Sequence, residues 1–173
     1  IKNIVSLEAR DNNFDKNNII TIRDLLKTSL RMRPDRIIVG EVRGEEAIDM
    51  LQAFSVGQDG SLSTIHANHA EDALYRLETM IMLSTNIPVE ALRRQIAAGV
   101  DIIVQLGRLR DKSRHVLEIR EVVGLKDKEI ETSLLYSYKE IREDGGVIIG
   151  EMIKENDLIH KDKLLRSGIT YEL

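Results

Sequence analysis

The sequence predicts an α/β fold, in which a mostly parallel sheet with flanking helices is followed by an annex of antiparallel strands. Up to residue 110, short apolar runs alternate with amphipathic helical patterns, the order typical of parallel strands joined by crossover helices. From residue 113 onward, long extended runs are separated by KDKE and EDGG, which have the composition of hairpin turns. We therefore divide the 173 residues into a core at 1–110 and an annex at 111–173.

The first predicted elements flank a polar stretch. Residues 1–8 have the pattern of a strand, and the Asn- and Asp-rich residues 11–18 that of a loop. Thr21 stands where an N-cap is expected, and Asp24 follows three residues later, as in a capping box. A helix should begin here and end before Pro34.

Two continuous apolar runs are the predicted inner strands of the sheet. They are RIIVGEV at residues 36–42 and SLSTIHA at residues 61–67. A helix is expected between them at residues 44–54, with Gly57 as its C-cap. A second helix should follow the second strand, capped by the side chain of Asn68.

The remaining pattern predicts a helix at residues 88–100, capped near Asn86, then a strand at residues 101–106 that completes the parallel core. A short helix is expected near the C-terminus, at residues 160–167. Arg93 and Arg94 are expected on the exposed face of the 88–100 helix, with a subunit contact as the alternative.

Composition argues against several classes of function. The net charge of −4 and the pI near 5.6 provide no general positive field for nucleic acid. The absence of cysteine excludes disulfides and thiolate metal sites. No apolar run approaches the roughly 18–20 residues that span a bilayer, so any membrane association should be peripheral. Because the first residue is Ile1 and the pattern starts in mid-strand, we expect an upstream part to be missing.

The segment SLRMRPDRIIVGEVRGEE, residues 29–46, combines arginines with one acid at the end of a predicted buried strand. Ligands of open α/β sheets bind at the carboxyl ends of strands. Glu41 at that position could orient a water, or hold Mg²⁺ directly or through water. The alternative is a purely structural ion pair with Arg43 or Arg33. Arg31 and Arg36 are the other cations of this segment.

Thr64 and His66 lie near the end of the second predicted strand. The period of two places both on one face of the strand, which should lie beside the strand that carries Glu41. An imidazole there could sense a γ-phosphate and pass its presence to the next helix. The alternatives are a structural histidine, or a metal site with His69 that lacks a clear third ligand.

Together the two segments resemble the ATPases of type II and type IV secretion systems, most closely the branch that assembles tight-adherence (Flp-type) pili. RMRPDRIIVGEVRGEEA is similar to the atypical Walker B motif of that branch, and GQDGSLSTIHAN to its histidine box. The resemblance implies part of a RecA-like P-loop domain that hydrolyses ATP with Mg²⁺ in a homo-hexamer. It also implies a cytoplasmic location at the membrane, an inner-membrane platform protein as partner, and no nucleic acid.

The resemblance also implies roles for individual residues. Glu41 corresponds to the glutamate that polarises the attacking water and, through water, to a Mg²⁺ ligand. His66 corresponds to the histidine near the γ-phosphate. The candidates to contact phosphate or a neighbouring subunit are Arg31, Arg33, Arg43 and Thr64.

Two departures from the pattern limit these expectations. Gly40 stands where the usual Walker B aspartate would be, and no GxxxxGK[ST] motif occurs in the chain. We therefore expect the chain alone to be inactive and to bind neither ATP nor Mg²⁺ tightly. Two alternatives remain: a non-catalytic ring or platform module of the same fold, and a nucleic-acid motor, which net acidity and 3% aromatic residues disfavour.

Overall fold

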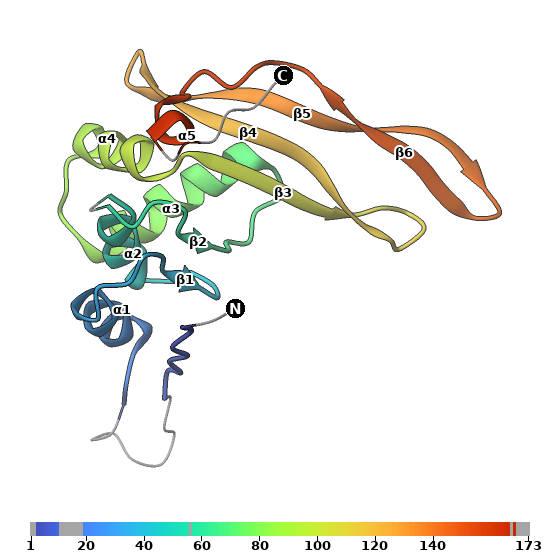
Figure 1. Ribbon diagram of the computed structural model, residues 1–173. Helices are drawn as coiled ribbons and strands as arrows, with labels where there is room; N and C mark the ends of the chain where they lie inside the picture. Colours follow the sequence, from blue (N-terminus) through green and yellow to red (C-terminus); the bar gives the residue numbers. More distant parts are fainter. Residues whose placement is uncertain (1–2, 11–18, 56, 167, 169–173) are drawn as a thin grey trace.

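The computed structural model describes residues 3–10, 19–55, 57–166 and 168 (Figure 1). A helical body contains a short parallel strand pair, and a long antiparallel sheet lies across the body and extends well past it. In chain order the elements are α1 (Ile22–Arg31), β1 (Ile38–Val39), α2 (Glu46–Ser55), β2 (Leu62–Ser63), α3 (Ala70–Ser84), α4 (Val89–Gly99), β3 (Ile102–Arg108), β4 (Arg114–Lys126), β5 (Glu129–Asp144), β6 (Val147–Lys154) and α5 (Asp162–Arg166).

The capping box at the start of α1 is confirmed. The Asp24 N–H donates to Thr21 Oγ1 at 3.1 Å, and the Thr21 N–H donates to Asp24 Oδ2 at 3.0 Å. The helix ends at Arg31, ahead of Pro34. An ion pair between Arg23 Nε and Asp49 Oδ2, 2.7 Å apart, attaches α1 to α2.

The parallel pair is formed by β1 and β2, with Ile38 opposite Leu62. Val39 is buried on one face of the pair. Ile38 and Leu62 lie on the other face and are 72% and 61% exposed. The regular ladder is much shorter than the apolar runs that predict it. Isolated hydrogen bonds extend the pairing, such as the one from the Val42 N–H to the Thr64 carbonyl at 3.0 Å.

The core lies where α2, α3 and α4 meet, and the antiparallel sheet closes it from one side. Leu51, Ile81, Leu92 and Ile96 are at most 1% exposed. Val122 of β4 joins the same cluster of buried side chains. The sheet is therefore fixed to the body through α4 and the middle of β4.

The antiparallel annex is confirmed, with strand order β3-β4-β5-β6. The β4–β5 and β5–β6 turns fall in the two predicted segments, where residues 127–128 and Gly145–Gly146 have positive φ, whereas the β3–β4 turn was not predicted. The predicted class, α/β with parallel and antiparallel parts, is therefore correct.

The assignment of residues 101–106 to the parallel core is wrong, because β3 pairs antiparallel with β4. Only the short turn at residues 109–113 joins these two strands, whereas a parallel pair would need a long crossover.

Some predicted element starts also differ from the structure. Residues 3–8 form no strand, and Arg10 makes a single antiparallel bridge to Ile20. Residues 1–2 and the predicted loop at 11–18 lie outside the described residues. The N-cap of α4 is Pro88, two residues after the position near Asn86 that the sequence predicted.

The N-cap of α3 is His69, not Asn68. The His69 side chain makes no capping hydrogen bond. Glu118 of β4 takes this role instead, since its Oε1 accepts the Ala70 N–H at 3.3 Å. A carboxylate at a helix N-terminus satisfies a free N–H and favours the helix dipole.

A buried carboxylate attaches the C-terminal segment to β4. Glu121 is 2% exposed and accepts the N–H groups of Ile159 and His160 at 2.8 and 2.7 Å. These bonds offset the cost of burying a charge. Among the described helices, none has the length and apolar character needed to cross a bilayer.

Asp111 links the far ends of the two long hairpins. Its Oδ2 accepts the Ile148 N–H at 2.9 Å, and its Oδ1 accepts the N–H and hydroxyl of Ser113 at 2.9 and 2.6 Å. These bonds, the one from Ile148 first, lower the pKa of Asp111 to about 2. Arg110 adds ion pairs with Glu140 and Glu143.

Replacing Ile96 with Ala should lower the free energy of unfolding by about 2–5 kcal/mol, because this fully buried side chain of α4 leaves a cavity. Urea unfolding measures the change. The control is Gln95→Ala on the exposed face of the same helix, expected within about 0.5 kcal/mol of wild type. Equal effects of the two changes would contradict the described core.

Asp111→Asn should lower the melting temperature at neutral pH. Because the folded pKa is depressed from 3.8 to about 2, the stabilisation is present above pH 3.8 and is lost as the pH falls toward 2. The melting temperatures of variant and wild type should therefore converge across that range. Asp144→Asn, on an exposed residue at the end of β5, is the control. A gap that stays constant down to pH 2 would contradict the assignment.

Candidate functional site

The candidate site lies at the carboxyl ends of β1 and β2, which point the same way because the strands are parallel. Glu41 follows β1 and His66 follows β2. His66 Nε2 is 2.8 Å from Glu41 Oε1, and Arg43 Nη2 is 2.6 Å from Glu41 Oε2. The structure thus brings together the acid, the histidine and one of the predicted arginines.

Two contacts fix the backbone around Glu41. The Thr64 hydroxyl donates to the Gly40 carbonyl at 2.6 Å, so this predicted site residue holds the β1 end against the β2 end. On the other side, Glu46 Oε1 accepts the N–H groups of Arg43 and Gly44 at 2.7 and 3.1 Å. The position of the Glu41 carboxylate is therefore set by its neighbours in both directions.

The Glu41 carboxylate is held ionised. The hydrogen bond with Arg43 is the main cause that lowers the pKa of Glu41, and the charges of Arg43, His66 and Arg76 add to it. The Glu41 side chain is 24% exposed, but its Oε1 is buried and has no well-oriented hydrogen bond among the described residues. The His66 contact at Oε1 is close without the angle of a hydrogen bond, so this buried oxygen is paired with the imidazole but accepts no hydrogen bond from it.

Arg76 is a neighbour of Glu41 that the sequence analysis missed. It lies on α3, and its positive charge acts on the Glu41 carboxylate. The sequence did offer one signal for Arg76. It lies two turns into the helix that follows the histidine segment, and that helix begins close to His66.

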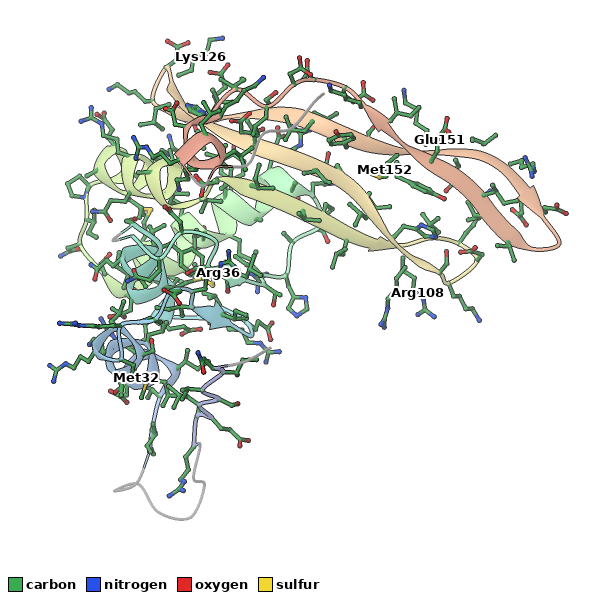
Figure 2. The ribbon with its side chains drawn as sticks, in the orientation of Figure 1. Met32, Arg36, Arg108, Lys126, Glu151 and Met152 are labelled. Atoms are coloured by element: carbon green, nitrogen blue, oxygen red, sulfur yellow. The ribbon has the colours of Figure 1, made fainter. Side chains whose placement is uncertain are left out.

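The other arginines of the Glu41 segment lie away from this cluster. Arg31 and Arg33 are exposed, and no contact within the described residues joins either to Glu41. Arg36, labelled in Figure 2, crosses Gly60 so closely that a Cβ there would lie 2.8 Å from the Arg36 Nε. Of the two structural ion pairs that the sequence left open, the structure contains the one with Arg43.

The expectation that Arg93 is exposed is wrong. Its side chain is 15% exposed and pairs with Glu78 at 2.8 Å and Glu129 at 2.6 Å, joining α3, α4 and β5. These contacts raise the pKa of Arg93 above its usual value, the hydrogen bond with Glu78 contributing most. Arg94 is exposed as expected.

Within the described residues, no three His, Cys, Asp or Glu side chains gather as a metal site. The Mg²⁺ contact predicted from the sequence is Glu41. Mg²⁺ commonly keeps several waters and takes one or two carboxylates together with substrate phosphates, so a single carboxylate fits such a role.

The segment that follows His66 is braced by the antiparallel sheet. Gln105 Nε2 of β3 donates to the carbonyls of Ala67 and Asn68 at 3.5 and 3.3 Å. Arg120 of β4 pairs with Glu71 in the first turn of α3 at 3.0 Å. A displacement of His66 would therefore be passed to the sheet.

Comparison with known proteins identifies the family of this chain. Residues 3–161 match the family described as "Type II/IV secretion system protein". The chain is 36% identical to the conjugal transfer protein TrbB of Rhizobium radiobacter over 146 residues, 84% of this chain. It is 41% identical to the type IV secretion system protein PtlH of Bordetella pertussis over 92 residues, 51% of this chain.

Among solved structures, the VirB11 ATPase of the Brucella suis type IV secretion system, in complex with sulphate, matches 58% of this chain with a TM-score of 0.53 and 33% identity. The chain spans 41% of the Rhizobium protein, 27% of the Bordetella protein and 31% of the Brucella chain. With the family match covering nearly all of the sequence, the chain belongs to the type II/IV secretion system protein family.

Proposed function

We propose that this chain supplies the Walker B and histidine-box part of an ATPase that powers type IV secretion or Flp-type pilus assembly. The observation that carries the proposal is the contact of Glu41 with His66 at the carboxyl edge of the parallel pair. An acid and an imidazole that meet where α/β sheets bind ligands are suited to a transferring phosphoryl group.

The lowered pKa of Glu41 decides which role suits it. A carboxylate that is ionised at neutral pH and already paired with Arg43 is a weak proton acceptor. Its contribution is to orient the attacking water as a carboxylate acceptor. His66, which is 78% exposed, then reports the state of the γ-phosphate to α3 through the braced segment at residues 67–70.

When bound with ATP, Mg²⁺ would neutralise charge on the β- and γ-phosphates. On this chain Glu41 would contact it, through water, and the phosphates need a further cradle because the chain contains no GxxxxGK[ST] motif. We therefore propose that the 173 residues alone neither hydrolyse ATP nor bind it tightly, and that a phosphate-binding half completes the site.

The assembly is part of the proposal. The relatives carry names from conjugal transfer and type IV secretion, which support a role in such a system. We propose in addition a homo-hexamer at the cytoplasmic face of the inner membrane that works on a platform protein. Arg31 and Arg33 are exposed and away from the Glu41 cluster, as expected of groups that reach the nucleotide of a neighbouring subunit.

Glu41→Gln should reduce Mg²⁺-dependent ATP turnover by about 100-fold or more in a protein that joins this chain to a phosphate-binding half, because the neutral amide neither attracts the metal nor aligns the water. Turnover and oligomeric mass are measured on the same samples. The control is Glu45→Gln, an exposed acid four residues later that pairs with Arg23 at 3.2 Å. Turnover that is absent in wild type, or unchanged by Glu41→Gln, would favour a non-catalytic ring module.

His66→Ala should lower turnover while nucleotide binding, measured by fluorescence of a labelled ATP analogue, stays near wild type. The reason is that the imidazole acts on the γ-phosphate at the end of β2 and is not part of the phosphate cradle. His69→Ala is matched to it, since His69 is an exposed histidine three residues later that makes no capping bond. Equal losses of turnover in both variants would contradict the role of His66.

A further inference from the structure

The turn between β3 and β4 carries a cluster of cations that the proposed ATPase site does not use. The cluster, here the basic hairpin end, consists of Arg108, Lys112 and Arg114. The hairpin extends past the helical body (Figure 1). Arg108 lies at the end of the sheet opposite to Lys126, as Figure 2 shows.

The backbone brings these cations together. Arg108 and Arg114 are directly opposite in the β3–β4 register. The turn closes through the Leu109 N–H, which donates to the Ser113 carbonyl at 2.9 Å. Lys112 sits in that turn with φ of 71°.

The nearby charges are already engaged elsewhere. Asp111 accepts from Ser113 and Ile148, and Arg110 pairs with acids of β5. Within the part of the chain that the structure describes, no carboxylate forms an ion pair with Arg108, Lys112 or Arg114. Arg108 Nε instead donates a hydrogen bond to the Lys112 carbonyl at 3.1 Å. The three charges therefore face outward.

The facing pair of Arg108 and Arg114 and the positive φ of Lys112 both lower folding stability. Like charges directly opposite on paired strands repel. A non-glycine residue with positive φ is strained by its Cβ, and glycine or asparagine would suit that position of the turn better. Within the described chain no acid pairs with these three cations, which is the arrangement expected of groups that meet an anionic surface outside the chain.

An open aliphatic face adjoins these charges. Along β3, Val104 and Leu106 are 50% and 68% exposed on the face that also carries Arg108. Val116 lies opposite Leu106 on β4. The other face at this point is filled, because Leu117 covers Gly107. Cations at the end of an aliphatic surface suit a bilayer, where headgroups take the charges and the interface takes the side chains.

We propose that the basic hairpin end docks this protein onto an anionic lipid surface through Arg108, Lys112 and Arg114, with Val104 and Leu106 entering the interfacial region. The attraction is local, since the chain as a whole carries a net charge of −4 and would be repelled in other orientations. Docking does not require the Glu41 side chain, because Arg108, Lys112 and Arg114 make none of the contacts that hold Glu41.

The test is co-sedimentation of the complete 173-residue chain with vesicles of phosphatidylcholine containing phosphatidylglycerol, and with vesicles of phosphatidylcholine alone. Wild type should sediment only with the anionic vesicles, and less at high salt. Lys112→Gly should bind about fivefold more weakly, and Arg108→Ala with Arg114→Ala more than about tenfold more weakly. Because Lys112→Gly also relieves backbone strain, its melting temperature should equal or exceed that of wild type, which separates loss of binding from misfolding.

The matched control is Lys128→Gly. Lys128 is also an exposed lysine with φ of 71° in a β-turn, but it lies in the β4–β5 turn. Its substitution removes the same charge and should leave vesicle binding unchanged. Sedimentation with neither vesicle, or equal losses in Lys112→Gly and Lys128→Gly, would overturn the proposal. Glu41→Gln should bind vesicles as wild type does, so failure of the ATPase proposal and failure of this one are distinguishable.

Discussion

The parallel pairing of β1 with β2 is the constraint on which the candidate site depends. The pairing sets Ile38 against Leu62, and the hydrogen bond from Thr64 to the Gly40 carbonyl carries the alignment beyond the ladder. With that register, Glu41 and His66 leave adjacent strands at the same edge and meet. Even a short sheet can bring the acid and the imidazole of the candidate site together when side-chain bonds continue it past its last regular pair.

The antiparallel sheet gives this small site a mechanical connection. β3 and β4 hold the segment after His66 through Gln105 and Glu118, and the same strands continue to the basic hairpin end. One sheet thus connects a group suited to sense phosphate with a surface suited to a membrane. The buried Glu121 attaches the C-terminal segment to that sheet.

Local signals in the sequence predicted much of this structure. Thr21 and Asp24 specify their helix start by short-range bonds, and the turn segments mark the hairpins of the annex. The partner of β3 was not predictable in this way, because an apolar run has the same pattern in a parallel and an antiparallel sheet. Arg93 was misplaced for a similar reason, since its burial depends on Glu129, 36 residues later in the chain.

The candidate site, too, was predictable from the sequence only in part. The Glu41 and His66 motifs were visible in the sequence, whereas the charge of Arg76 and the brace from Gln105 depend on three-dimensional proximity. The most direct test of the central claim is a structure of the protein joined to a phosphate-binding half, with Mg²⁺ and a non-hydrolysable ATP analogue. The γ-phosphate should lie beside His66, with a water between it and the Glu41 carboxylate. A nucleotide bound away from the carboxyl ends of β1 and β2 would contradict it.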